Sequence, residues 1–389
     1  MKDSQKRSIA VLGSTGSVGL QALDVAKQMD LRVDYIAARS DIKALEAQAR
    51  TFLPRFCAVA DENAASELKI RLKDTSVRVL SGTDELLDGI AMTDAETVVN
   101  SVLGMDGLRP TIATLKAGRR LALANKESMV IAGAIVNRLV KENQTEILPV
   151  DSEHCAIFQC MKAGRPAEVK RILLTASGGP FFGYTREELS RVTRRETLAH
   201  PTWKMGAKIT VDSATLMNKG FEVMEAVHLF SVKPEQVEVV VHRESIIHSA
   251  VEYIDNAVIA QMGSPDMRMC VQYAITYPDR APAVIEPLDL FRQGKLTFAK
   301  PNLETFPLLK TAYRCLSLGG AVPAVLNAAN EVAVAAFLSD SLSFCGIAEV
   351  VCETVERLSD AAAEGALDGI FAYDRQARIV AREIMNGVN

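Results

Sequence analysis

Ser8-Ile9-Ala10-Val11-Leu12-Gly13-Ser14-Thr15-Gly16-Ser17-Val18-Gly19 is the stretch that decides the fold class of this 389-residue chain. Its first five residues form a short apolar run, which is typical of a buried strand, and three glycines follow at intervals of three residues. Apolar residues then recur at roughly helical spacing from Leu20 to Ala26, so the sequence predicts a strand, a glycine-rich turn and a helix. Such glycines let the backbone approach a pyrophosphate, and the N–H groups that open the helix attract anions. Alone, the Gly-x-x-Gly-x-x-Gly spacing is also compatible with a plain turn between a strand and a helix.

Further apolar runs alternate with helical stretches along the first 150 residues, at 32–37, 57–60, 77–80, 97–100, 120–124 and 146–150. This alternation is typical of a parallel sheet with crossover helices. We therefore predict an α/β fold class whose N-terminal part is a doubly wound, Rossmann-like domain.

The end of the second predicted strand carries Arg39 and Ser40, where a doubly wound fold places the group that reads the adenosine ribose. A carboxylate at this position accepts the ribose 2′-OH of NAD, whereas an arginine suits the 2′-phosphate of NADP. The sequence favours NADP, although Asp41 follows directly and leaves the carboxylate alternative open.

The composition excludes several classes of protein. Hydrophobic residues make up 48% and charged residues 24% of the chain, which is typical of a soluble globular protein. A formal net charge of −4 with only 5% aromatic residues argues against a nucleic-acid partner, and no apolar run approaches the roughly 18 residues of a membrane span. The seven cysteines form no Cys-x-x-Cys pair, which indicates reduced thiols and a cytoplasmic location. Small molecules are the expected partners, and the length predicts two or three domains.

Two carboxylates follow the predicted strand at 146–150, in Asp151-Ser152-Glu153-His154. Ligands of open α/β sheets bind just beyond the carboxyl ends of the strands. On an extended segment Asp151 and Glu153 project to the same side, and oxygen ligands of this kind suit Mg²⁺ or Mn²⁺. The alternative is a solvated acidic loop or a helix N-cap made by Asp151 or Ser152.

A second polar cluster lies downstream, where Ser213, Asn218 and Lys219 offer a hydroxyl, an amide and an ammonium to a phosphate. Glu222 follows Asn218 by four residues and Lys219 by three, so the three share a helix face. Glu222 is thereby available as a third metal ligand. The alternative is an ordinary surface pair of Lys219 and Glu222.

Two loops have a composition that is typical of ligand-binding loops. Ser177 precedes two glycines, an arrangement fit to wrap an anion. The only tryptophan, Trp203, lies in a polar stretch punctuated by proline and glycine, which predicts a closing lid near residues 196–206. The alternative for Trp203 is an aromatic residue that anchors a surface loop. Two histidines without neighbours at ligand spacing are predicted to pack or to lie on the surface, namely His228 and His242.

Taken together, these motifs resemble those of the 1-deoxy-D-xylulose 5-phosphate reductoisomerase family. In the order found in that family they are GSTGSVG (13–19), ANKES (124–128), DSEH (151–154), SGGPF (177–181), HPTWKMG (200–206), DSATLMNKG (212–220) and LNAANEVAV (326–334). Ordered motifs of this length across essentially the whole chain are specific, and they outweigh the local alternatives above.

The resemblance implies an NADPH- and divalent-metal-dependent enzyme. Such an enzyme converts 1-deoxy-D-xylulose 5-phosphate to 2-C-methyl-D-erythritol 4-phosphate in the non-mevalonate isoprenoid pathway. The family reaction joins a skeletal rearrangement, by retro-aldol cleavage and re-addition, to a hydride transfer from NADPH. The resemblance also implies a homodimer.

The family pattern assigns each site residue in turn. The expected metal ligands are Asp151, Glu153 and Glu222. The expected substrate contacts are Lys126, Ser152, Glu153, Ser177, His200, Trp203, Ser213, Asn218, Lys219 and Glu222. The expected NADPH contacts are Thr15, Gly16, Ser17, Val18, Arg39, Ser40, Asn125, Glu127 and Gly206. The expected catalytic residues are Lys126, Glu153, His200 and Glu222. Ala38-Arg39-Ser40 departs from the more usual Gly-Lys/Arg-Asn but keeps the cation.

The motif order also predicts the domain organisation. The expected parts are an NADPH-binding domain at 1–150, a catalytic domain at 151–282, a linker at 283–303 and a helical C-terminal domain at 304–389.

Two alternatives come from other classes of protein. An aspartate-semialdehyde dehydrogenase needs a nucleophilic cysteine, and only Cys155, beside His154, has a neighbouring histidine. An inactive sensor of NADPH and sugar phosphate would show a damaged set of metal carboxylates, yet all three are present.

Overall fold

The computed structural model describes residues 7–203 and 205–387, which fold into two compact units. The first unit comprises the chain up to Ser128 together with Val136–Cys155 and Asp266–Glu286. The second unit comprises Met129–Ile135, Ala156–Pro265 and the chain from Pro287 onward. The predicted division by function at residues 150, 282 and 303 stays a prediction.

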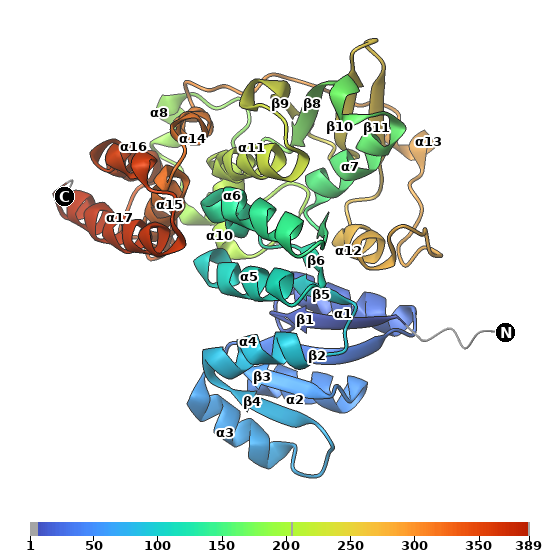
Figure 1. Ribbon diagram of the computed structural model, residues 1–389. Helices are drawn as coiled ribbons and strands as arrows, with labels where there is room; N and C mark the ends of the chain where they lie inside the picture. The colour runs from blue at the N-terminus through green and yellow to red at the C-terminus, as the bar shows by residue number, and fades with distance from the viewer. Residues whose placement is uncertain (1–6, 204, 388–389) are drawn as a thin grey trace. The chain divides into compact units, whose positions relative to one another are not determined.

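A seven-stranded parallel sheet forms the centre of the first unit, in the order β4-β3-β2-β1-β5-β6-β7 (Figure 1). Its strands are β1 (Ser8–Leu12), β2 (Arg32–Ala38), β3 (Phe56–Val59), β4 (Arg78–Ser81), β5 (Thr97–Asn100), β6 (Arg120–Leu123) and β7 (Ile147–Pro149). The order reverses between β1 and β5, where Val11 pairs with Val99. In a doubly wound sheet, ligands bind outside the strand ends at such a reversal.

The strands of this sheet are apolar because both faces are covered. Alternate residues of β1, β2 and β3 pack with Leu86 and Ile90 of α4 (Gly82–Met92) in one continuous core. The intervening residues, such as Ile9, Val11 and Ile36, are also fully buried. The predicted fold class is therefore confirmed, and the predicted strands lie within two residues of the observed ones.

The glycine-rich turn between β1 and α1 (Ser17–Gln28) is required by backbone packing. Gly13 has a φ of +76°, a conformation that residues with a side chain rarely adopt. A Cβ atom on Gly19 would lie 2.2 Å from the carbonyl oxygen of Gly13, so the start of α1 packs against the turn only with glycine there. Gly16 meets only that same oxygen, at 3.3 Å. Packing alone therefore constrains Gly16 least among the three glycines.

The other helices of the first unit follow the strands in chain order. They are α2 (Ile42–Phe52), α3 (Glu62–Arg71), α4, α5 (Leu108–Lys116) and, returning from later in the chain, α12 (Met267–Thr276). Helix α12 packs against α1, and Arg268 Nη1 lies 2.9 Å from Asp24 Oδ2. Two further helices, α6 (Glu127–Glu142) and α7 (Ser152–Cys160), begin just after β6 and β7.

A four-stranded sheet lies in the second unit, in the order β11-β10-β8-β9. Its strands are β8 (Val169–Ala176), β9 (Val237–Val241), β10 (Ile247–Tyr253) and β11 (Val258–Met262). Strands β8 and β9 are parallel, and the other pairs are antiparallel. Strand β11 lies at the edge, and its residues are mostly exposed.

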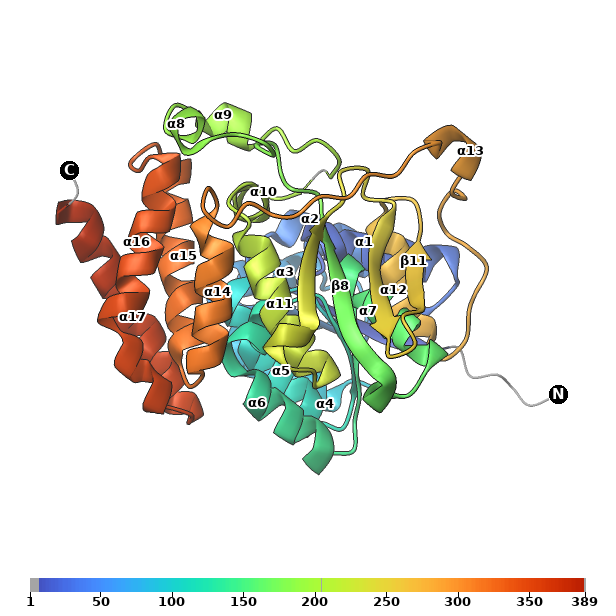
Figure 2. The same ribbon diagram turned by 90° about the horizontal axis from the view of Figure 1, so that it is seen from above.

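The helices of the second unit include those that carry most of the motif at 212–220 and the motif at 326–334. They are α8 (Arg186–Leu189), α9 (Arg194–Thr197), α10 (Ala207–Ala214), α11 (Met217–Phe230), α13 (Leu290–Gln293), α14 (Pro307–Leu318), α15 (Val322–Leu338), α16 (Phe344–Arg357) and α17 (Leu367–Gly387). The last four pack together, as Figure 2 shows in orange and red. Asn330 of α15 donates a hydrogen bond of 2.8 Å to the buried Asp212 of α10. This bond ties the C-terminal helices to the helix that carries Ser213.

Within residues 7–203 and 205–387, no helix combines the length and the apolar character needed to cross a bilayer.

Candidate functional site

The glycine-rich turn presents the N-terminus of α1 at the strand ends of the first unit. Gly16 is the N-cap of α1, and no side chain caps this helix. Gly16 and Ser17 are exposed, while Thr15 and Val18 are half-buried. The turn itself is fixed by Ser14, whose Oγ donates to Gln48 Oε1 at 2.7 Å. A rigid turn with an open helix N-terminus is a suitable place for a pyrophosphate.

Arg39 and Ser40 are both exposed directly after β2. The neighbouring carboxylate, Asp41, is the N-cap of α2, where its Oδ1 accepts a hydrogen bond of 3.0 Å from the backbone N–H of Ala44. The carboxylate alternative for this position is therefore weakened, because Asp41 is already used in capping.

Asn125 and Glu127 shape the turn between β6 and α6. The Asn125 side chain is buried and donates to the carbonyl of Gly104 at 2.9 Å and to Glu127 Oε2 at 3.2 Å. Its Oδ1 accepts from the backbone N–H of Ser128 at 3.1 Å. Both residues stay predicted NADPH contacts, and Asn125 in addition holds the local backbone.

The expectation of an extended segment at Asp151–Glu153 is wrong, because α7 begins at Ser152 and includes Glu153 in its first turn. The backbone carbonyl of Asp151 accepts from the N–H of Cys155 at 2.8 Å. Asp151 therefore stands at the start of a helix, where the positive end of the helix dipole favours a carboxylate. The side chains of Asp151 and Glu153 are held by this helix turn instead of by the alternation of a strand.

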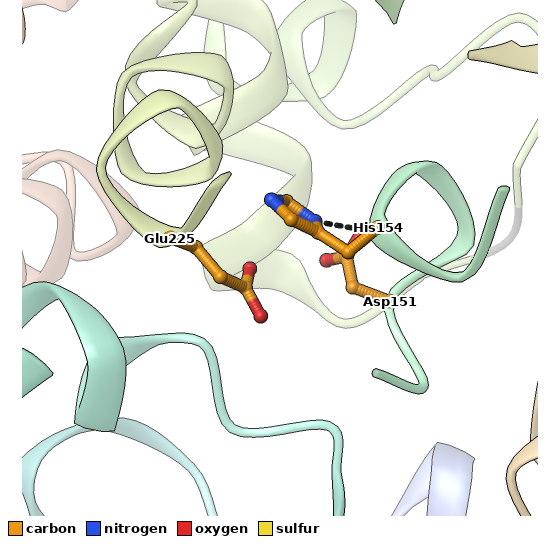
Figure 3. A group of neighbouring side chains, drawn as sticks. All are labelled: Asp151, His154 and Glu225. Carbon is orange, nitrogen blue, oxygen red and sulfur yellow. Dashed lines mark ion pairs between the residues drawn. The ribbon is translucent and has the colours of Figure 1, made fainter. Parts of the chain in front are cut away.

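Asp151 forms a buried ion pair with Lys126 Nζ, and both side chains are about nine-tenths buried. Oδ1 of Asp151 lies 3.5 Å from Nδ1 of His154, which is fully buried. Figure 3 marks this pair with a dashed line. Burial alone would raise the pKa of the Asp151 carboxyl, but Lys126 and His154 outweigh it and hold the pKa well below its usual range. Asp151 is therefore an anion. Beside it, Ser152 Oγ donates to Glu153 Oε2 at 2.6 Å.

Helix α11 of the second unit carries a second buried pair. Asn218 Nδ2 and Lys219 Nζ both donate to the carboxylate of Glu222. Lys219 is only 4% and Glu222 only 1% exposed, so the alternative of a surface Lys–Glu pair is wrong. An ion pair survives burial only with good geometry and further hydrogen bonds, and Asn218 supplies one of these.

Two predicted phosphate residues, Ser177 and Ser213, meet at His200. Its Nε2 lies 3.0 Å from Ser177 Oγ and 3.1 Å from Ser213 Oγ. Its Nδ1 accepts backbone N–H bonds from Thr202 at 3.2 Å and from Trp203 at 2.9 Å. Because Nδ1 is used as an acceptor, the neutral ring carries its proton on Nε2, which faces the two serines.

Desolvation, with a smaller contribution from the positive charge of Arg243, lowers the pKa of His200 to about 4. Around neutral pH His200 is therefore an uncharged hydrogen-bond donor. It contributes a directed N–H rather than a charge to this cluster.

Trp203 is half-buried, and the centroids of its ring and of the His248 ring are 6.2 Å apart. Its loop is hydrogen-bonded to His200, so the two residues are held together. The expectation of a lid at 196–206 includes Lys204, which lies outside the described residues. Gly206 is exposed at the N-cap of α10.

Several residues near these clusters have no role assigned by sequence reasoning. His154, Glu225 and His248 are almost fully buried, and Arg243 contacts the backbone beside Ser177. The packing role of His242 is confirmed, since it is fully buried and its Nε2 accepts from the backbone N–H of Ile246 at 3.2 Å. His228 also packs, because a Cβ on Gly133 would lie 2.3 Å from its ring.

Family models cover nearly all of the chain. The model described as 1-deoxy-D-xylulose 5-phosphate reductoisomerase matches residues 9–133. The models of that enzyme's C-terminal domains match residues 147–230 and 262–380. The chain belongs to the 1-deoxy-D-xylulose 5-phosphate reductoisomerase family. The resemblance stated from the motifs is thereby confirmed.

Individual reductoisomerases are similar over their full lengths. The chain is 47% identical to 1-deoxy-D-xylulose 5-phosphate reductoisomerase 1 of Bacillus thuringiensis over 97% of this chain and 98% of that protein. The structure of the Zymomonas mobilis enzyme in complex with NADPH is 40% identical and covers 98% and 99% of the two chains, with a TM-score of 0.92. A reductoisomerase structure with NADPH, fosmidomycin and magnesium is 36% identical, with 98% of each chain covered and a TM-score of 0.93.

The neutral state of His200 can be tested by NMR titration of the five histidine rings, with a His200→Gln variant to assign its signal. We expect its pKa well below the ordinary value of 6.5, near 4. A lowered folded-state pKa means that the contribution of this group to stability is complete above about pH 6.5 and is lost as the pH falls towards 4. A measured pKa of 6 or above would contradict the assignment.

Proposed function

We propose that this chain catalyses the NADPH- and divalent-metal-dependent conversion of 1-deoxy-D-xylulose 5-phosphate to 2-C-methyl-D-erythritol 4-phosphate. The reaction belongs to the non-mevalonate route to isoprenoid precursors. The observation that carries this proposal is the match to reductoisomerases at 47% identity over 97% of the chain, with every sequence motif of the site present.

NADPH binds, in this proposal, at the turn between β1 and α1. The pyrophosphate lies at the N-terminus of α1, contacted by Thr15, Gly16, Ser17 and Val18. Three observations support this placement. No side chain caps the N-terminus of α1, and few atoms pack against Gly16. Arg39 is exposed at the end of β2, where a doubly wound fold would bind the 2′-phosphate. The remaining contacts proposed for the cofactor are Ser40, Asn125, Glu127 and Gly206.

The donor set of this chain fits a hard divalent cation. Asp151, Glu153 and Glu222 offer carboxylate oxygens alone, as Mg²⁺ and Mn²⁺ prefer. Asp151 Oδ1 is buried and accepts no hydrogen bond from the described part of the chain, so it has a lone pair for a ligand. We propose these three residues as the metal ligands. The bound ion supplies Lewis-acid stabilisation of negative charge that develops on substrate oxygens.

Two lysines pair with two of the three proposed ligands in the described structure. Lys126 pairs with Asp151, and Lys219 pairs with Glu222. The ammonium of Lys126 helps to hold the pKa of Asp151 low, and a metal requires an ionised carboxylate. In the proposed active state Lys126 and Ser152 contact the hydroxyl and carbonyl oxygens of the substrate, and Lys219 contacts its phosphate.

The phosphate of the substrate lies, in this proposal, at the cluster of Ser177, His200 and Ser213. The hydroxyls of Ser177 and Ser213 lie 3.0 Å and 3.1 Å from His200 Nε2, so all three groups are near one another before a phosphate binds. Asn218 and Lys219 complete the set with an amide and a charge. Trp203, whose backbone N–H is bonded to His200, covers the substrate. It thereby excludes water from the enolate that retro-aldol cleavage of the substrate generates.

The dehydrogenase alternative requires an accessible thiolate. Cys155 is 1% exposed, so a substrate cannot reach its sulfur without local unfolding. This observation disfavours an aspartate-semialdehyde dehydrogenase mechanism. The inactive-sensor alternative is decided by the activity assay below.

The functional division of the chain remains part of the proposal. Residues 1–150 bind NADPH, 151–282 carry the metal and substrate residues, 283–303 are a linker, and 304–389 form the C-terminal helical domain. A cytoplasmic location is proposed because none of the seven cysteines, all within the described residues, forms a disulfide, and cell fractionation tests it.

Purified protein should oxidise NADPH in the presence of 1-deoxy-D-xylulose 5-phosphate only when Mg²⁺ or Mn²⁺ is added. Glu222→Gln should lower turnover by about a hundredfold or more, because a neutral amide is a poor ligand for a hard cation. NADPH binding, measured by fluorescence, should not change. The exposed Glu235→Gln is the matched control. Turnover in EDTA, or an unchanged rate for Glu222→Gln, would refute the metal assignment.

Replacing Arg39 by Ala should raise the KM for NADPH at least tenfold while it changes the KM for NADH less than threefold. The physical reason is that the 2′-phosphate gains a charge-assisted hydrogen bond that NADH cannot make. Lys27→Ala, which removes an exposed cation from the far end of α1, is the control. Equal effects on the two cofactors would show that Arg39 does not read the 2′-phosphate.

We also propose that the chain forms a homodimer. The edge strand β11 exposes the side chains of Val258, Ile259 and Met262, and its free edge can pair with a second copy. Sedimentation at micromolar concentration should give twice the monomer mass. Val258→Lys together with Ile259→Lys should shift it to the monomer mass, and a wild-type monomer under these conditions would contradict the proposal.

A further inference from the structure

Arg243 contacts the backbone of the loop that carries Ser177. It lies in the connection between β9 and β10, and its Nη1 donates to the carbonyl oxygen of Ser177 at 2.9 Å and to that of Gly179. One guanidinium nitrogen therefore joins two carbonyls of the same loop. The sequence motifs gave Arg243 no role, and the function proposed above does not use it.

The loop has little freedom on its other sides. Gly178 and Gly179 have φ values of +75° and +64°. A Cβ on Gly178 would lie 2.9 Å from Val241 Cγ1, and one on Gly179 would lie 2.9 Å from the carbonyl oxygen of Ser213. The loop is therefore packed between β9 and the end of α10, which is the helix that carries Ser213.

The two bonds from Arg243 determine which way the loop presents its polar groups. A trans peptide directs its C=O and N–H to opposite sides. With the Ser177 carbonyl bonded to Arg243, the N–H of Gly178 points away from the guanidinium. The N–H of Gly179 donates to Ser177 Oγ at 3.2 Å, and this oxygen lies 3.0 Å from His200 Nε2. The orientation of the Ser177 hydroxyl thus depends on a backbone that Arg243 holds.

The surroundings of Arg243 strengthen these bonds. Its side chain is half-buried, and its guanidinium carbon lies 5.3 Å from the centroid of the Phe182 ring. Hydrogen bonds from a cation are stronger where water is partly excluded. The nearby Glu244 is bonded to the hydroxyl of Thr297 at 2.7 Å. Through its bonds to the carbonyls, Arg243 also places a positive charge close to the Ser177–Gly179 loop.

We propose that Arg243 is a positioning residue for the phosphate pocket, which holds the Ser177–Gly179 loop in the conformation that binds the substrate phosphate. This inference rests on the function proposed above. Lysine cannot fully replace it, because the guanidinium presents its donors in a fixed plane whereas an ammonium is a point charge on a flexible stem.

The test compares Arg243→Gln, Arg243→Lys and the control Arg191→Gln. Arg191 is an exposed arginine of the same unit that pairs with Glu187. Two quantities are measured for each folded protein: the steady-state constants with 1-deoxy-D-xylulose 5-phosphate and NADPH, and the Kd for inorganic phosphate from the shift of the His200 ring signals. Thermal unfolding confirms that each variant is folded.

For Arg243→Gln we expect the KM for the sugar phosphate and the Kd for inorganic phosphate to rise together, by about tenfold or more, which is the scale of one lost charge-assisted hydrogen bond. The kcat should change less than threefold and the KM for NADPH less than twofold. Arg243→Lys should recover part of the loss, because it keeps the charge. Arg191→Gln should behave as the wild type.

Three results would overturn the inference: phosphate constants of Arg243→Gln within twofold of the wild type, an equal rise in the KM for NADPH, or the same loss in Arg191→Gln. If Arg243→Gln does not fold, wild-type phosphate constants in Arg243→Lys would overturn it instead. A wild-type protein that binds phosphate but does not turn over the sugar phosphate refutes the proposed function. In that case the phosphate Kd of the variants still decides the role of Arg243.

Discussion

Two buried ammonium–carboxylate pairs are the interactions on which the proposed active site depends: Lys126 with Asp151, and Lys219 with Glu222. A single buried charge without a partner costs several kcal/mol, roughly as much as a large part of the stability of a domain. The two charged groups of each pair must therefore be held within bonding distance of one another, and the helices position them. Asp151 is fixed by the first turn of α7, and Lys219 and Glu222 are fixed by one turn of α11. Two of the three carboxylates of the proposed metal site are thus already held in place by a lysine before any ion binds.

The parts of this fold that could be predicted are those determined by neighbours in the sequence. The strands at 8–12 and 97–100 appear at the predicted bounds, because an apolar run between turn residues leaves little choice of conformation. The glycine turn was predictable for the same reason, since Gly13 needs a positive φ and Gly19 must lack a side chain. The helix face shared by Asn218, Lys219 and Glu222 follows from spacing alone, and the structure shows both donors on Glu222.

The parts that could not be predicted are those that local spacing leaves open and those that depend on contacts between distant segments. Spacing suggested an extended Asp151–Glu153, but α7 begins one residue after Asp151, and helical and extended forms of so short a segment have the same pattern. In the sequence Arg243 resembles any polar residue of a strand connection, and its contact with Ser177, 66 residues away in the chain, appears only in the folded structure. The burial of Lys219 and Glu222 could not be predicted either. A Lys–Glu pair at this spacing is usually exposed, whereas here both side chains are almost inaccessible to solvent.

The charges of the second unit suggest how the proposed sites interact. His200 is neutral around pH 7, and Ser177 and Ser213 offer hydroxyls, so in the proposed phosphate site these three groups contribute dipoles and no charge. Lys219 brings a full charge, but its ammonium is already bonded to Glu222. A phosphate dianion that draws on Lys219 weakens that pair and leaves the carboxylate more available to another cation. By linkage, any cation that stabilises Glu222 must favour phosphate binding to the same extent. On this argument the two proposed sites are coupled through Lys219.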